Sequence, residues 1–163
     1  MLKKNAEEYL FSEAVRYLGK YPATKKKIGI YLQKKIMNKK TYQRAIFPND
    51  ISKEHLIAKV VDKLVELKII NEENYLESLF HYYKKSLFSL RKIKNKLFQK
   101  GFEQKIIDEF ISEKINENSN IELEILKEYI TRKKLSKLDS FELKKKLYQQ
   151  SFSENSIYKV VKE

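Results

Sequence analysis

The chain has 163 residues, of which 42% are hydrophobic and 35% are charged, with three glycines, two prolines and no cysteine. This composition supports a packed core and favours helices with charged surfaces over a turn-rich β-sandwich. The lack of cysteine excludes disulfide bonds, thiol catalysis and cysteine-based zinc sites. No apolar run approaches the roughly 20 residues that span a bilayer, and no apolar leader follows Met1. We therefore expect a cytoplasmic protein that contacts no membrane.

The basic residues are unevenly distributed along the chain. Thirty-five Lys and Arg against 22 Asp and Glu give a formal net charge of +13. Residues 1–100 hold 23 basic and 10 acidic residues, whereas residues 101–163 hold 12 of each. A positive field of this size predicts an anionic partner, such as a nucleic acid, an acidic protein surface or a nucleoprotein.

Apolar residues recur at helical spacing along most of the chain, and no segment alternates with period two. The first helix is expected from about Ala6 to Leu18, with Gly19 as its C-terminal cap. Thr24 is a natural N-cap for the second helix, and a third helix follows Ser52. The intervening residues 38–51 are predicted to form a loop.

The helical pattern repeats at offsets of 65 and then 50 residues. Each copy has a capping residue, an aliphatic residue four positions later and a leucine four positions after that. The three sets are Thr24, Ile28 and Leu32; Ser89, Ile93 and Leu97; and Asp139, Leu143 and Leu147. Phe102 and Phe152 stand at equivalent turns, and we expect both rings to be buried in the core. The sequence therefore predicts an all-α fold of three tandem three-helix repeats forming an elongated, curved array. Their expected bounds are 1–70 (with the long internal loop 38–51), 71–117 and 118–163.

Several of these residues carry a family resemblance. The block 96–102, Lys-Leu-Phe-Gln-Lys-Gly-Phe, resembles the Lys-Leu-x-x-Lys-Gly-Phe signature of the RecX family, the regulators of the RecA recombinase. The block 142–147 is similar to the preceding Glu-Leu-x-x-Lys-Leu part of that motif. The segment 70–75 is similar to the start of the family's second repeat. Other matches in the first repeat are Ala14, Tyr17, Leu18, Pro22 and Thr24. The chain departs from the family pattern at Tyr21 (usually Arg), Lys68 (usually Gly) and Asn71-Glu72 (usually an Asp pair).

This resemblance implies a function without catalysis. It implies that the protein binds RecA–DNA filaments and inhibits strand exchange and ATP turnover, and so controls DNA repair and recombination. We expect a monomer without a cofactor that binds single-stranded or duplex DNA only weakly and without sequence specificity.

The second helices of the first two repeats hold the candidate binding residues. With Ile28 and Leu32 facing inward, helical geometry directs Lys26, Lys27 and Lys34 outward. In the second repeat, Arg91 and Lys92 are expected to point outward, with Lys94 and Lys96 flanking them. Flexible lysines supply charge to phosphates or acidic side chains without reading sequence. The predicted basic ridge comprises Lys25, Lys26, Lys27, Lys34, Arg91, Lys92, Lys94, Lys96 and Lys100.

No enzyme or metal motif competes with this interpretation. His55 and His81 lie in different predicted helices, and the single Glu77–His81 pair lacks the second pair that a di-iron bundle needs. The chain contains no Gly-x-Gly loop or P-loop. We therefore expect no metal, no cofactor and no catalytic residue.

Two other functions are compatible with a basic helical protein. A helix-turn-helix at Lys100-Gly101-Phe102 would place a helix rich in acids against DNA phosphates, which disfavours it. A scaffold for an acidic protein stays open. The rings of Tyr82 and Tyr83 suit base stacking but favour core burial.

Overall fold

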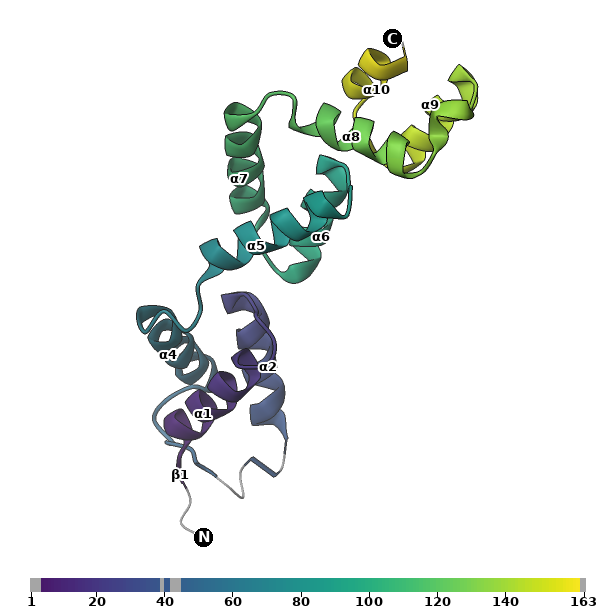
Figure 1. Cartoon of the computed structure of the whole chain (residues 1–163). Coiled ribbons are helices and arrows are strands. Elements are labelled where there is room, and N and C mark those ends of the chain that lie inside the picture. The colour runs from purple at the N-terminus through teal and green to yellow at the C-terminus, as the bar shows by residue number, and fades with distance from the viewer. Residues whose placement is uncertain (1–3, 39, 42–44, 162–163) are drawn as a thin grey trace. The chain divides into compact units, whose positions relative to one another are not determined.

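The computed structural model describes residues 4–38, 40–41 and 45–161. Within these residues the fold is built from helices (Figure 1), and the predicted all-α class is confirmed. The expectation that no strand would form is wrong in one detail. Strand β1 (Lys4–Asn5) pairs in parallel with β2 (Ala45–Ile46), two residues each. None of the described helices is both long and apolar enough to cross a membrane.

The chain divides into two compact units, Met1–Tyr75 and Leu76–Glu163. The boundary falls inside one helix, α5 (Glu72–Lys85). The bounds of the three sequence repeats stay a prediction, although the helices follow in an order that matches them.

Polar caps set the helix starts of the first unit. Helices α1 (Ala6–Leu18), α2 (Lys25–Met37) and α4 (Lys53–Glu66) begin after Asn5, Thr24 and Ser52, and each of these side chains accepts a backbone N–H of its helix. The three helices pack pairwise. The fully buried side chains at their centre are Leu10, Ile28, Leu32, Val60 and Leu64.

The long connection between α2 and α4 is more structured than the predicted loop. Thr41 is buried, and its Oγ1 donates a hydrogen bond to the carbonyl of Lys35 at 2.7 Å. Ala45 is also buried, at the start of β2. These contacts attach the connection to α2 and α1. The predicted loop residues 39 and 42–44 lie outside the described residues.

The second unit continues with α6 (Leu90–Lys100), α7 (Gln104–Glu117) and α8 (Ile121–Arg132). A short 3-10 helix, η1 (Leu135–Lys137), leads to α9 (Ser140–Gln149) and α10 (Glu154–Val161). Ile93, Leu97 and Leu147 are fully buried, as their repeat positions predict, whereas Leu143 is only half-buried.

The two turn phenylalanines belong to the core. Phe102 is 3% exposed and Phe152 is 4% exposed, which confirms the burial that we predicted for them. Each ring follows a residue with left-handed backbone, Gly101 and Ser151. The chain reverses there, and the aromatic side chain enters the helix interface.

Candidate partner-binding surface

The N-terminus of α2 concentrates positive charge. Lys25, Lys26 and Lys27 form its first turn, are all exposed, and are accompanied by no acid in that turn. Cations at this end oppose the helix dipole, at a cost of about 0.3–1 kcal/mol each. Glu72 offsets part of this cost for Lys25. Its carboxylate accepts the Lys25 backbone N–H at 2.7 Å and lies 3.8 Å from Lys25 Nζ. The result is a strongly positive end on α2.

The cations of α6 differ in their surroundings. Arg91 and Lys96 are exposed, as is Lys100 at the end of the helix. Lys94 Nζ lies 2.7 Å from Asp108 Oδ1, and this hydrogen bond holds the pKa of the Asp108 carboxyl below its usual value. Lys94 is therefore already paired with an acid on α7.

The expectation that Lys92 points into solvent is wrong. Its side chain is half-buried, and Nζ donates to Gln150 Oε1 at 2.5 Å. The same ammonium group lies 5.9 Å from the centre of the Phe88 ring. The α6 cap Ser89 also bonds to this segment, since its Oγ donates to the Gln150 carbonyl at 2.9 Å. Lys92 therefore helps to fasten α6 to the end of α9.

Five residues of the predicted ridge remain exposed with no ion pair among the described residues. They lie on two separate helices, so we refer to an α2 face and an α6 face. The α2 face comprises Lys26, Lys27 and Lys34, and the α6 face comprises Arg91 and Lys96.

Glu13 is a buried acid to which the sequence analysis assigned no role. It is 5% exposed and accepts from Lys35 Nζ at 2.6 Å and from Arg16 at 2.7 Å. The hydrogen bond to Glu13 raises the pKa of Lys35. Because it joins α1 to α2, this cluster is structural, and Lys35 does not extend the α2 face. No periodicity in the sequence signals it, because Glu13 and Lys35 are 22 residues apart.

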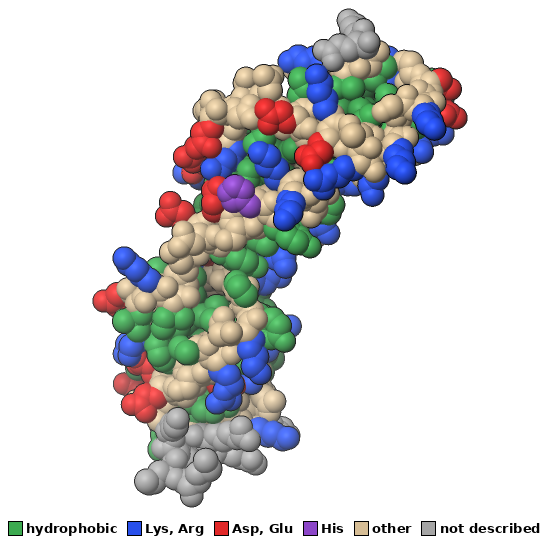
Figure 2. Space-filling view, viewed as in Figure 1, with side chains coloured by type: hydrophobic (Ala, Val, Ile, Leu, Met, Phe, Trp, Pro, Cys, Tyr) green, Lys and Arg blue, Asp and Glu red, His purple; other side chains and the backbone are tan. Residues whose placement is uncertain are grey.

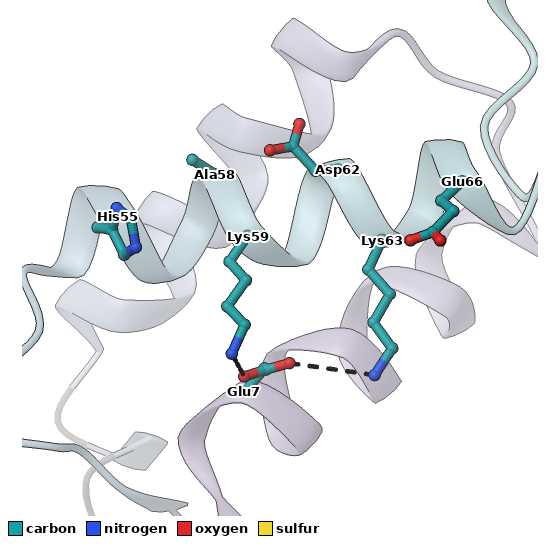
Figure 3. A pocket seen from close by; sticks show the side chains of 7 residues that line it. All are labelled: Glu7, His55, Ala58, Lys59, Asp62, Lys63 and Glu66. Atoms are coloured by element: carbon teal, nitrogen blue, oxygen red, sulfur yellow. Dashed lines mark ion pairs between the residues drawn. The ribbon is translucent and has the colours of Figure 1, made fainter.

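A groove between α1 and α4 contains both acids and bases (Figure 3). Lys59 and Lys63 point down toward Glu7, at 2.7 and 4.0 Å from its carboxylate oxygens. The hydrogen bond from Lys59 lowers the pKa of Glu7. These two lysines are neutralised within the chain and add nothing to the α2 face.

The Glu77–His81 pair singled out in the sequence is part of an exposed ion-pair network. His81 Nε2 lies 3.1 Å from Glu77 Oε1, and Lys114 Nζ reaches the same oxygen at 3.2 Å. Among the described residues, no group of three or more His, Cys, Asp and Glu side chains is arranged to hold a metal ion. The Glu77 carboxylate is instead contacted by the His81 ring and the Lys114 ammonium group.

Comparisons with known proteins support the fold and the family. No family model matches the chain. The crystal structure of RecX from Lactobacillus salivarius superposes with a TM-score of 0.70, covering 96% of this chain and 95% of that one at 18% identity. It shows the same fold. The regulatory protein RecX of Caldanaerobacter subterraneus subsp. tengcongensis is 32% identical over 108 residues, or 66% of this chain.

Sequence and fold similarity together support the RecX family for this chain. The resemblance that we derived from the Lys-Leu-x-x-Lys-Gly-Phe block is thereby confirmed. The matched part spans about half of the Caldanaerobacter protein, 54% of its length. This similarity does not by itself locate a binding surface on this chain, so the α2 and α6 faces rest on the structural argument above.

Proposed function

We propose that this protein is a non-enzymatic regulator that binds RecA–DNA filaments. Bound there, it inhibits strand exchange and ATP turnover, and so controls DNA repair and recombination. It acts as a cytoplasmic monomer and needs no cofactor. The similarity to the RecX family supports this proposal, since the matched relative is named a regulatory protein.

The observation that carries the proposal is the set of exposed cations on the α2 and α6 faces that form no ion pair within the described part of the chain. Other lysines of the chain form ion pairs with Glu7, Glu13 and Asp108, whereas these five cations form none among the described residues. In the first turn of α2, Lys26 and Lys27 oppose the helix dipole without a compensating acid in that turn, and a polyanionic partner would offset this cost. A RecA–DNA filament presents phosphates and acidic side chains to such faces. DNA alone gives only weak binding without sequence preference, because lysines contact phosphates and not bases.

A pull-down tests the proposal directly. Tagged protein is incubated with RecA, single-stranded DNA and a non-hydrolysable ATP analogue, then with each component omitted in turn. We expect retention of RecA only when all three are present. Retention of RecA without DNA would indicate a scaffold for an acidic protein, and no retention in any mixture would contradict the proposal.

A further inference from the structure

The balanced charge of residues 101–163 hides two opposite regions. Residues 101–130 hold three basic and eight acidic residues, whereas residues 131–149 hold seven basic and two acidic ones. The second group covers the turn after α8 and the whole of α9. In Figure 2, Lys and Arg side chains gather over this part of the molecule, at the upper right. The C-terminal third therefore has a basic surface of its own, which the overall charge count concealed.

Exposed aromatic rings accompany these cations on α9. Phe141 is 77% exposed and Tyr148 is 45% exposed. They are seven residues apart, so they lie on the same side of the helix, about 10 Å apart along its axis. Lys144 and Lys145 fall between them on that side. Along this face, the two lysines therefore lie between the two aromatic rings.

A third ring from α10 borders the same face. Lys144 Nζ lies 4.9 Å from the centre of the Tyr158 ring, which is 42% exposed. Loss of hydration raises the pKa of Tyr148, and the neighbouring Glu154 and Tyr158 raise it further. Lys144 therefore lies beside the Tyr158 ring and on the same side of α9 as Phe141 and Tyr148.

The fold does not account for the exposure of Phe141. Helix α9 begins because Asp139 Oδ1 accepts the backbone N–H groups of Phe141 and Glu142 at 2.9 and 2.8 Å. That cap needs no ring. Phe152, by contrast, is buried, and the centre of its ring lies 5.6 Å from the centre of the Tyr129 ring. Because the Phe141 ring is mostly exposed, its burial contributes little to the stability of the fold. The ring is therefore available to contact a ligand.

We propose that the α9 face, comprising Phe141, Lys144, Lys145, Tyr148 and Tyr158, binds single-stranded nucleic acid. Unpaired bases stack on Phe141 and Tyr148, and the lysines between the rings neutralise the connecting phosphates. A phenylalanine ring has no hydrogen-bonding group with which to read a groove edge, and it stacks only on bases that are not already stacked in a duplex. The face therefore prefers a single strand to a duplex.

The α9 face ends near Tyr148. Beyond Tyr148 the neighbouring groove contains Glu122 and Glu154 together with Arg91 and Lys94 of α6. The Glu122 carboxylate accepts hydrogen bonds from Ser153 and Ser156. These two acids disfavour a continuous phosphate path, so the α9 face acts separately from the α6 face.

Fluorescence anisotropy with the purified full chain and no RecA tests the assignment. The probes are a labelled oligothymidine of about 20 nucleotides, longer than a typical site of about 4–16, and a duplex of the same length. The double variant Phe141→Ala/Tyr148→Ala should bind the oligothymidine at least about fivefold more weakly, with less than about twofold change for the duplex. Phe141→Leu, which keeps the apolar area but not the flat ring, should lose affinity in the same direction. Melting temperatures check that the variants stay folded.

Tyr82→Ala is the matched control, because Tyr82 on α5 lies outside the α9 face and is 65% exposed, whereas the sequence favoured its burial in the core. It should leave oligothymidine binding unchanged. The inference is overturned if the double variant binds the oligothymidine like the unmodified protein, if duplex binding falls equally, or if Tyr82→Ala weakens binding as much. It is also overturned if the ring variants lose only RecA-filament binding, since the rings would then contact protein. Oligothymidine binding without any RecA effect would contradict the proposed function and leave this inference standing.

Discussion

Gly101 and Ser151 occupy the same backbone position in two turns that lie 50 residues apart. Their φ angles are 98° and 63°, both in the left-handed region. In each turn the next residue, Phe102 or Phe152, donates its N–H to the carbonyl of a leucine five residues earlier, at 3.4 and 3.3 Å. The geometry is therefore the same in both turns, but only one has the residue that adopts it without strain.

Replacing Ser151 by glycine should stabilise the protein. The left-handed conformation costs a non-glycine residue about 1–2 kcal/mol, and the added freedom of glycine in the unfolded chain offsets part of this. We expect a gain of about 0.5–1 kcal/mol in the free energy of unfolding, measured by urea denaturation. Gln149 is the last residue of α9, and Gln149→Gly should instead lower the stability, because glycine is unfavourable in a helix. Equal losses at both positions would show that the backbone of Ser151 is not strained.

The same reasoning applies to Lys68, which follows α4 and has a φ of 54°, also in the left-handed region. Ile69 and Ile70 both donate to the Leu64 carbonyl across this turn. Lys68→Gly should raise the melting temperature, whereas Lys68→Ala should leave it nearly unchanged, because alanine keeps the strain. A similar rise for both changes would assign the effect to the lysine charge.

Phe102→Ala should be severely destabilising. The ring is 3% exposed, and removing a buried phenylalanine costs roughly 3–5 kcal/mol through lost burial and the cavity left behind. Phe98→Ala is the control on the same α6–α7 segment, because Phe98 is 56% exposed and should cost little. Chemical denaturation of the two variants measures the difference. Similar stabilities would show that Phe102 is not a core residue and would add it to the candidates for partner contact.

Acid should weaken the attachment of α1 to α4 through Glu7. The folded-state pKa of Glu7 lies below its usual value of 4.5 because Lys59 hydrogen-bonds to the charged form. Its contribution to stability is therefore present above pH 4.5 and is lost as the pH falls through the lowered value. Glu7→Gln should lower stability at neutral pH by at most about 1 kcal/mol and flatten the acid side of the stability profile. Glu8→Gln, at an exposed neighbouring position, should leave the profile as it is; a flattening there would contradict the assignment to Glu7.

The features that the sequence predicted correctly depend on local signals. Thr24, Ser52 and Asp139 are caps that act within one turn, and the buried Ile93 and Leu97 follow from helical periodicity. The repeat also placed Phe102 and Phe152 at equivalent buried turns. Such signals need no knowledge of how helices pack.

The features that it missed depend on contacts between distant residues. The side chain of Lys92 turns to Gln150, 58 residues away, so its position on a helical wheel could not reveal its partner. The β1–β2 pair joins the start of α1 to the long connection, and two residues per strand leave no alternating pattern. The lysines of α9 were left out of the predicted ridge, because the acids of α7 and α8 cancel their charge in the count for residues 101–163.

The central claim is that the α2 and α6 faces bind the RecA–DNA filament, and a charge swap of Lys26, Lys27, Arg91 and Lys96 to glutamate tests it most directly. Lys92 is left unchanged because of its contact with Gln150. The matched control swaps four other exposed cations, Lys20, Lys85, Lys105 and Lys159, and so changes the net charge equally.

The measurement is inhibition of RecA ATP turnover on single-stranded DNA as a function of protein and salt concentration. The account predicts that the swap on the two faces abolishes most of the inhibition and flattens its salt dependence, because fewer ion contacts form on binding. The control variant should inhibit nearly as well as the unmodified protein. Equal inhibition by both variants, or an equal loss in both, would contradict the assignment of filament binding to these two faces.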